Sequence, residues 1–385
     1  MGERFDVVVV GAGPGGSTAA YRLSREGARV LMLDRQSFPR DKPCGGGLTT
    51  RAMRTLPFDV SPVVEDEVDK VELRLRYRRS TSQQFDAPIA RMTQRRRLDA
   101  FLAETAAAAG ADFRDGVRVR DIALDAPGGR PVVSLDGGDR VTAEVVIGAD
   151  GANGVTAKAL GLGADRLFAV ALEGNAPMTP EREARHRATA SLEIDTVPGG
   201  YGWVFPKADH INVGVGGWAH EGPRMRRHLD VLCAMHDVRP DELTDVRGHR
   251  LPLRRTWSGV ARGRAAVVGD AAGLVDPLSG DGMFEAFLSS EIASATALDV
   301  LAGRAQGMEP YRWRVQRALA GHAATAWLAR AALERIPTIT FHVLRSDQAR
   351  RFLGHRLATR PPEVRVPLIG GVERVARRAL GPAAG

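Results

Sequence analysis

The sequence predicts an α/β protein with a Rossmann-type nucleotide-binding domain, an inserted antiparallel-sheet domain and a helical C-terminal region. Glycine-rich turns follow apolar, strand-like segments at three places, and the first of them opens a helix. Alternating segments between residues 188 and 216 predict the inserted sheet, and the pattern after residue 282 is mostly helical. The expected domains are 1–60, 90–165 and 247–305 for nucleotide binding, 61–89 and 166–246 for the substrate sheet, and 306–385 for the helical region.

The first glycine-rich turn reads GAGPGG from Gly11 to Gly16 and follows the apolar run 7–10. Gly11 allows the tight turn, Gly13 lets the backbone approach a pyrophosphate, and Gly16 lets the next helix pack on the strand. The N-terminus of that helix faces the phosphate charge. Asp34 closes the following strand and is placed to accept hydrogen bonds from ribose hydroxyls.

Two further turns follow in a fixed order. GADG at 148–151 comes after an apolar strand, and GD at 269–270 comes after another. The last turn continues to GDG at 280–282, before a long helical stretch. A lone turn of this kind is weak evidence, but the three together describe a pocket for FAD. We therefore expect a Rossmann-type FAD-binding domain that holds FAD noncovalently.

Other elements follow from periodicity and turn residues. A helix is expected over 94–109, with Thr93 as its N-cap and Gly110 at its end. Strands are expected at 117–124, 132–135, 141–147, 188–194, 201–205 and 211–216. The first three form a small meander that returns the chain to the nucleotide domain, and the last three belong to the second sheet.

Composition narrows the class of protein. The net charge is +8, and only four of the 54 basic residues are lysines. This excess of arginine indicates a coding bias rather than a nucleic-acid-binding surface, because no nucleic-acid-binding motif accompanies the charge. No apolar run is long enough to span a bilayer, and the N-terminus enters the first strand without a signal peptide. Cys44 and Cys233 cannot form a disulfide framework, which indicates a cytoplasmic protein. The histidines are scattered, so no metal site is expected, and the oligomeric state stays open.

Two segments are more specific than the glycine turns. The first reads FPRDKPCGGG over 38–47, and the second reads YGWVFPK over 201–207. They are similar to PxxKxCGGG and YxWxFP patterns, and through them the chain resembles the geranylgeranyl reductase family, within the p-hydroxybenzoate hydroxylase-like flavoproteins. The resemblance runs through nearly the whole chain. It implies an FAD-dependent oxidoreductase that acts on CH–CH groups.

The resemblance also implies roles for site residues. Arg95 would reach the FAD phosphates, Val119 would touch the adenine through its backbone, and Asp270 would bond the ribityl chain. Free N–H groups at the start of the long helix near Met283 would face the edge of the flavin ring. The full set of expected FAD contacts is Gly11, Gly13, Gly15, Gly16, Asp34, Arg35, Cys44, Gly45, Gly46, Gly47, Arg95, Val119, Asp150, Asp270, Gly282 and Met283.

The segment 201–207 predicts a substrate surface. Side chains alternate across a strand, so Tyr201, Trp203 and Phe205 project from one side. Such a wall suits a long polyprenyl chain, although aromatic residues also pack as ordinary core. By resemblance, Cys44 faces the place where substrate and flavin meet. It positions the substrate, helps to deliver a proton, or is a small inert thiol, and the sequence leaves these roles open. Cys44, Tyr201 and Trp203 are the expected catalytic residues.

The resemblance implies saturation of isolated C=C bonds in a polyprenyl or isoprenoid substrate, with hydride from N5 of reduced FAD. An FAD-dependent monooxygenase that hydroxylates or epoxidises a hydrophobic small molecule is the alternative. A prenyl-binding protein without catalysis is a third hypothesis. The sequence contains no second unit of strand, glycine turn and helix, so NADPH or a ferredoxin-like carrier is expected to visit as the reductant.

The segment 364–380 mixes apolar residues with Arg374, Arg377 and Arg378. This pattern suits a helix on an anionic surface, peripheral on the inner face of the cell membrane. It equally suits an amphipathic helix that packs on the protein. The apolar residues concerned are Val366, Leu368, Ile369, Val372, Val375 and Leu380.

Overall fold

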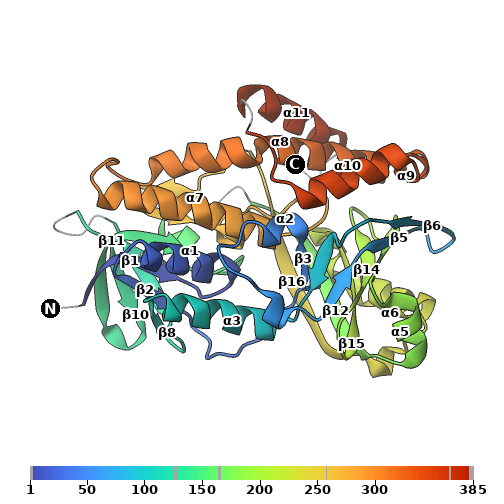
Figure 1. Cartoon of the computed structure of the whole chain (residues 1–385). Coiled ribbons are helices and arrows are strands. Elements are labelled where there is room, and N and C mark those ends of the chain that lie inside the picture. The colour runs from blue at the N-terminus through green and yellow to red at the C-terminus, as the bar shows by residue number, and fades with distance from the viewer. Residues whose placement is uncertain (1–2, 125–128, 164–165, 257, 364–365, 381–385) are drawn as a thin grey trace.

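The computed structural model describes residues 3–124, 129–163, 166–256, 258–363 and 366–380. Two sheet domains lie beside each other, and helices from the C-terminal part of the chain run along one edge of both (Figure 1). This arrangement confirms the predicted fold class.

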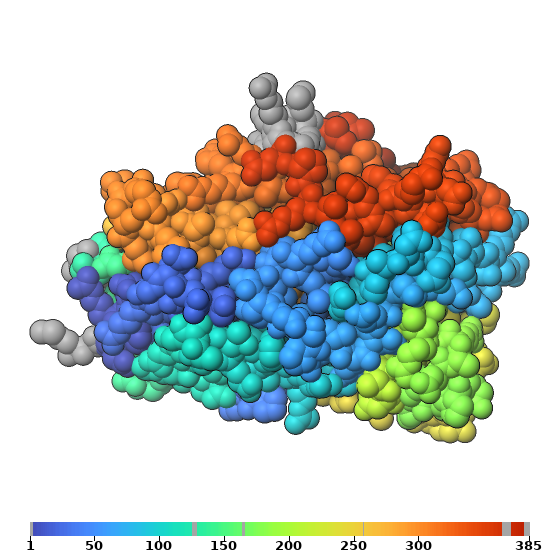
Figure 2. All heavy atoms as spheres, in the orientation of Figure 1, coloured from blue at the N-terminus to red at the C-terminus, as the bar shows by residue number. Residues whose placement is uncertain are grey.

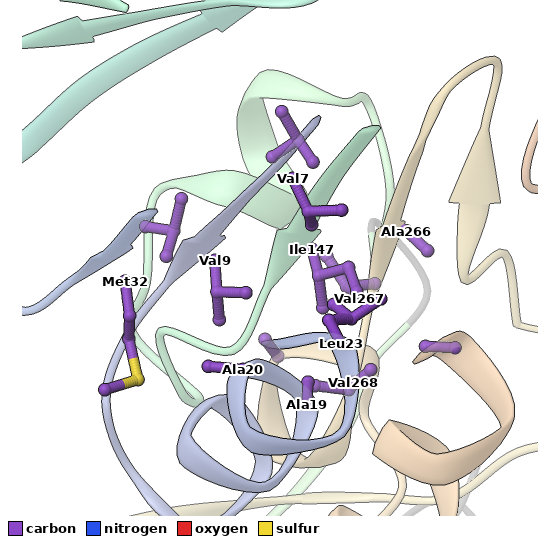
Figure 3. Close-up of a cluster of buried hydrophobic side chains, with 14 of the residues drawn as sticks. Val7, Val9, Ala19, Ala20, Leu23, Met32, Ile147, Ala266, Val267 and Val268 are labelled. Atoms are coloured by element: carbon purple, nitrogen blue, oxygen red, sulfur yellow. The ribbon is translucent and has the colours of Figure 1, made fainter. Parts of the chain in front are cut away.

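The nucleotide-binding sheet has a parallel centre in the order β18-β11-β1-β2-β8. Its central strand β1 is buried on both faces, as continuous apolar runs predict for parallel sheets. Helix α1 (Pro14–Arg25) packs on this sheet, and its small residues Ala19 and Ala20 lie in one buried cluster with Val7 and Val9 of β1 (Figure 3). The strands of this sheet are β1 (Arg4–Val10), β2 (Val30–Leu33), β8 (Asp112–Arg114), β9 (Val119–Ala123), β10 (Val132–Leu135), β11 (Arg140–Gly148), β17 (Ala261–Arg262) and β18 (Ala265–Val267).

The second sheet has seven strands in the order β16-β12-β15-β14-β13-β5-β6. All neighbours are antiparallel except β13 and β5, which run parallel. Its strands are β5 (Lys70–Leu75), β6 (Arg79–Gln84), β12 (Leu167–Pro177), β13 (Thr189–Ile194), β14 (Tyr201–Pro206), β15 (His210–Trp218) and β16 (Thr244–Leu253). A small sheet of β3 (Gly47–Thr49), β7 (Ala90–Met92) and β4 (Asp66–Val68) joins the two domains.

Two local features differ from expectation. The chain was expected to return to the nucleotide domain at residue 247, but β16 pairs with β12 as far as Leu253, so this strand stays in the second sheet. The expected N-cap at Thr93 is wrong, because its hydroxyl donates to the Val63 carbonyl oxygen. Gln94 takes the N-cap position of α3 (Arg95–Ala108), and Gly110 follows its end with a positive φ.

Most of the remaining helices cover the sheets. In the nucleotide domain, α1 (Pro14–Arg25) and α7 (Met283–Leu301) pack on each other, while α8 runs along α7. Further along the chain, α11 packs on α8, α9 contacts β5, and α10 contacts α2 (Figure 1). These other helices are α2 (Thr50–Met53), α4 (Thr156–Ala159), α5 (Pro180–His186), α6 (Met225–Met235), α8 (Glu309–Arg335), α9 (Pro337–Leu344), α10 (Asp347–Ala358) and α11 (Val366–Leu380). Across the described ranges, no helix has the length and apolarity to cross a membrane.

Candidate active site

A cavity of about 1340 Å³ lies where the two domains meet. Its walls are the glycine turns, the segment 38–47, one face of the second sheet, and the helices α8 to α10. The cavity brings together every site residue expected from the sequence except Gly16, which lies just behind its wall.

Close packing of backbone around Gly11 shapes one end of the cavity. Gly11 has a φ of +101°, and a Cβ at this position would lie 2.5 Å from the carbonyl oxygen of Ala149. A Cβ on Gly16 would lie 1.7 Å from the carbonyl oxygen of Gly11. Neither position accepts a side chain, so these two glycines hold the first turn against the second turn and against α1.

Two arginines, the buried Arg95 and the half-buried Arg40, face this first turn. Terminal nitrogens of Arg40 and Arg95 lie 3.4 and 3.9 Å from where a Cβ on Gly13 would be. Asp99 orients both, with two 2.7 Å bonds from Arg95 and one 2.8 Å bond from Arg40. No side chain caps the N–H groups at the start of α1, at Pro14. Open N–H groups and two cations at a helix N-terminus fit a pyrophosphate, which supports FAD at this end.

Asp34 lies at the end of β2, on the edge of the same compartment. Its carboxylate accepts from the Ala12 N–H at 2.9 Å and from the Gln36 N–H at 3.0 Å. Those bonds fix the position at which it can also meet a ribose hydroxyl. Arg35 and Val119 line this end as well.

Asp150 lines the cavity but has a second task. Its Oδ2 accepts from both the backbone N–H and the hydroxyl of Thr156, each at 2.9 Å, so the carboxylate holds the start of α4. Burial raises the pKa of Asp150.

Asp270 follows β18 at the third turn and carries a charge pair. Its Oδ2 accepts from the Lys42 Nζ at 3.0 Å and lies 3.5 Å from the His249 Nε2. Burial favours the neutral acid, but Lys42 and His249 outweigh burial and hold the pKa of Asp270 far below its usual value. Gly282, the residue before α7, lies close to this carboxylate, and Met283 begins the helix.

The Cys44 loop, which is part of the segment 38–47, is held against the second sheet by two hydrogen bonds. The Cys44 N–H donates to Glu173 Oε1 at 2.5 Å, and Lys207 Nζ donates to the Gly45 carbonyl oxygen at 2.6 Å. Gly46 has a φ of +68°, and a Cβ there would lie 2.0 Å from the Thr93 carbonyl oxygen. The loop therefore needs glycine to fit between the sheet and the start of α3, and the partly exposed Cys44 thiol lines the cavity.

Tyr201, Trp203 and Phe205 of β14 form an aromatic wall that connects the Cys44 loop with the third turn. Tyr201 donates its hydroxyl to the Ser279 carbonyl oxygen at one end, and Phe205 packs on Gly45 at the other. The Trp203 ring lies between them, with centroids 6.0 Å from Tyr201 and 6.3 Å from Phe205. Its indole N–H donates to Asn212 Oδ1 at 2.8 Å. All three rings line the cavity, as the alternation predicted.

The sheet face behind this wall changes character across its width. On the β5 and β13 side it is apolar, and leucines of α8, α9 and α10 close the compartment opposite. On the β12 and β16 side it carries charged and polar groups. The apolar residues are Val71, Leu73, Ala190, Leu192, Ile194, Leu333, Leu344, Leu353 and Leu357, and the polar ones are Glu173, Arg247 and His249.

Sequence reasoning missed three residues of this site. Arg40 lies in the segment 38–47, and Lys207 closes the segment 201–207, so both were within the motifs without a role. Glu173 lies in the middle of β12, where no motif marks it. In the described part of the chain, no group of His, Cys, Asp and Glu residues is arranged to hold a metal ion.

Comparison with known proteins agrees with this geometry. The family profile of an FAD binding domain matches residues 4–182. The chain is 32% identical over 330 residues to the chloroplastic geranylgeranyl diphosphate reductase of Oryza sativa, covering 80% of this chain and 68% of the rice protein. It is 34% identical over 303 residues to the menaquinone reductase of Mycolicibacterium smegmatis, covering 74% of each chain.

Solved structures show the same fold at lower identity. A geranylgeranyl bacteriochlorophyll reductase-like protein from Thermoplasma acidophilum superposes with a TM-score of 0.77 at 21% identity, over 100% of this chain and 98% of that one. The myxobacterial chondrochloren halogenase superposes with a TM-score of 0.68 at 18% identity, over 98% and 97%.

Proposed function

Because the chain belongs to the geranylgeranyl reductase family of FAD-dependent oxidoreductases, we propose that it saturates isolated C=C bonds of a polyprenyl substrate. One observation carries the proposal. A compartment suited to a dinucleotide and a compartment lined by apolar side chains meet at the Cys44 loop and the aromatic wall. The relatives named as geranylgeranyl diphosphate reductase and menaquinone reductase support a substrate with an isoprenoid chain.

The residues of the apolar compartment bind and orient the chain. Its leucines and valines bury the substrate away from water, and the aromatic wall limits how the chain lies across the Cys44 loop. When bound and reduced, FAD supplies a hydride. An unactivated alkene has no carbonyl to hold negative charge, so positive charge develops on the more substituted carbon. Tyr201, Trp203 and Phe205 can stabilise that charge through their ring faces by roughly 0.5–2 kcal/mol.

Anaerobic turnover tests the proposal. Dithionite-reduced protein is incubated without oxygen with polyprenyl alcohols, diphosphates and quinones, and products are identified by mass spectrometry. We expect a gain of two hydrogens per saturated bond. An oxygenated product that forms only in air, with no anaerobic saturation, would instead support the monooxygenase alternative. The halogenase-like neighbour shares the fold alone at 18% identity and does not favour that alternative.

We propose that NADPH or a ferredoxin-like carrier reduces the flavin by a transient visit. Stopped-flow absorbance at the flavin band distinguishes them, because direct bleaching by NADPH at a catalytically sufficient rate supports the first donor. No bleaching by NADPH, together with bleaching by a reduced ferredoxin, supports the second.

We also propose that the protein collects its substrate at an anionic membrane surface, through α9 and α10. The outer faces of these helices expose Ile339 (60%), Val343 (59%) and Phe352 (62%). Arg345 and Arg351 lie exposed among these side chains and can contact anionic headgroups. In the space-filling view the two helices form one continuous outer surface above β5 and β6 (Figure 2). Their inner leucines line the cavity, so the surface borders the substrate compartment.

Helix α11, where the sequence suggested docking, is a weaker place for it. Glu373, Ala376 and Leu380 are buried, and the helix packs on α8. Val375 is 66% exposed. The side chains of Val366, Leu368 and Ile369 lie outside the described residues.

Liposome co-sedimentation separates the two helices. We expect binding that needs anionic lipid, falls with added salt, and weakens in Ile339→Asp and Phe352→Asp. The matched control is Val375→Asp on α11. Loss of binding only in Val375→Asp or on truncation before Pro367 would place docking on α11, and binding indifferent to lipid charge, salt and all variants would remove the proposal.

A further inference from the structure

Glu173 lies in the row of residues that crosses the active-site face of the second sheet. It is in register with Gly214 of β15, which in turn pairs with Trp203 of β14. Residues directly opposite in antiparallel strands point to the same face, so Glu173 and Trp203 face the cavity together. The Glu173 side chain is buried, and it lines the cavity beside the Cys44 loop.

The contacts of Glu173 leave one carboxyl oxygen available to the cavity. Its Oε1 accepts the Cys44 N–H at 2.5 Å. Among the described residues, the Cys44 N–H is the only hydrogen-bond partner of the Glu173 carboxyl group, and its Oε2 has no ion-pair partner. A buried carboxyl group without a close counter-ion is favoured in its neutral, protonated form.

The charged groups around it modify that preference without reversing it. Burial raises the pKa of Glu173 to about 7, and Asp41 also raises it, while the Cys44 N–H bond, Lys207 and Arg95 lower it. These groups come from the segment 38–47, the end of β14 and α3, and Arg247 is the cross-strand neighbour on β16. Near neutral pH, the carboxyl group therefore carries a proton for a large part of the time.

We propose that Glu173 is the proton donor for saturation of the substrate double bond, an inference that rests on the proposed function. The Glu173 O–H bond breaks and a C–H bond forms at the less substituted alkene carbon. The other carbon gains the hydride that the proposed function supplies, so the substrate is reduced by two electrons. After the transfer the Glu173 side chain is a carboxylate, and it takes up a new proton from water. In this role Cys44 acts by placing the loop against the substrate, with its N–H bonded to Glu173.

Glu173→Gln tests this role with little change of shape. The glutamine oxygen still accepts the Cys44 N–H, so the loop keeps its place, but the side chain has no acidic proton. We expect full FAD content and a single-turnover saturation rate that is lower by about 100-fold or more, within the usual range for a lost general acid. The wild-type rate should fall as pH rises through about 7, and the variant rate should lose this dependence. Glu173→Asp should restore part of the rate together with a pH dependence.

A second readout needs no turnover. Infrared difference spectra between wild-type and Glu173→Gln resting protein, without substrate, should contain a carboxylic-acid C=O band that titrates near pH 7. The matched control is Glu221→Gln, which changes another buried glutamate that does not line the cavity and should change neither the rate nor this band.

The outcomes separate the two proposals. Wild-type protein that saturates no polyprenyl compound overturns the proposed function, and the proton role with it. Active wild-type protein with Glu173→Gln above a tenth of its rate and an unchanged pH profile overturns the proton role alone. A difference spectrum that shows only carboxylate at pH 6 does the same.

Discussion

The end of the cavity beside the glycine turns is built mainly from backbone, whereas the end beneath α8 to α10 is built from side chains. At the first end, Gly11 and Gly16 bring main-chain atoms into direct contact, and open N–H groups face the cavity. At the second end, rings and leucines from six separate elements form the wall. The comparison shows that one site can combine a half whose main-chain turns follow short, recognisable motifs with a half that exists only after the sheet has its register.

Two buried carboxyl groups show the same contrast in their charge. Asp270, at the backbone-built end, is ionised because Lys42 and His249 hold its pKa down. Glu173, on β12 beside the Cys44 loop, has a pKa raised to about 7 because burial dominates. The first suits a fixed contact with a cofactor, and the second suits a group that gives and takes a proton.

The largest expected effect comes from filling the backbone contact. Gly16→Ala should abolish FAD retention and destabilise the fold by more than about 4 kcal/mol, because its Cβ would overlap the Gly11 carbonyl oxygen. Flavin absorbance of the purified protein and thermal denaturation measure both effects. Gly222→Ala is the control, since a Cβ there meets nothing within 4 Å. A Gly16→Ala protein with full flavin content would contradict the account of this turn.

The next largest effect is on the pH dependence of stability when Glu173 or Asp270 is replaced. Because the folded-state pKa of Glu173 is raised from 4.5 to about 7, its burial costs stability progressively as pH rises from about 4.5 to 7. Glu173→Gln should therefore gain up to about 3 kcal/mol relative to wild type between pH 5 and pH 8, measured by urea unfolding at equal FAD concentration. Asp270→Asn should show the opposite trend, with a stability loss at pH 6 that shrinks on acidification. If the stabilities of the two variants changed with pH in the same direction relative to wild type, the opposite charge states assigned to Glu173 and Asp270 would be contradicted.

The aromatic wall should affect turnover without affecting the cofactor. Trp203→Ala and Cys44→Ala should keep FAD and lower alkene saturation by about 100-fold, since both side chains line the substrate side of the cavity. Trp203→Phe should recover much of the rate because it keeps a ring face. Full turnover in both alanine variants would show that substrate lies elsewhere.

The smallest expected effect concerns the predicted contact of Asp270 with FAD. Asp270→Ala should weaken FAD binding by roughly tenfold, the size of one charge-assisted hydrogen bond, while Lys42 loses its partner. Flavin fluorescence titration of protein stripped of FAD measures the change. Unchanged affinity would mean that the carboxylate serves only to hold Lys42.

The nucleotide-binding half could be predicted because its geometry requires particular residue types at particular spacings. GAGPGG after a strand is visible in a linear sequence, and so is the alternation that places Tyr201, Trp203 and Phe205 on one face. Glu173 could not be predicted, because its place depends on the pairing of β12 with β15, far along the chain. The extent of β16 was missed for a related reason. Half of its residues are exposed to water and three more are partly exposed, so it lacks the apolar alternation that marks a half-buried strand.

Because only one of the two cysteines is buried, the other can be modified selectively. Cys233 has no exposed surface within the core beneath α6, while Cys44 is partly exposed in the cavity. Buried thiols are inert toward alkylating reagents, so a maleimide should modify Cys44 alone. The rate of Cys44 alkylation therefore reports whether the cavity is occupied, because any compound that fills the substrate compartment should shield the Cys44 sulfur and slow the reaction.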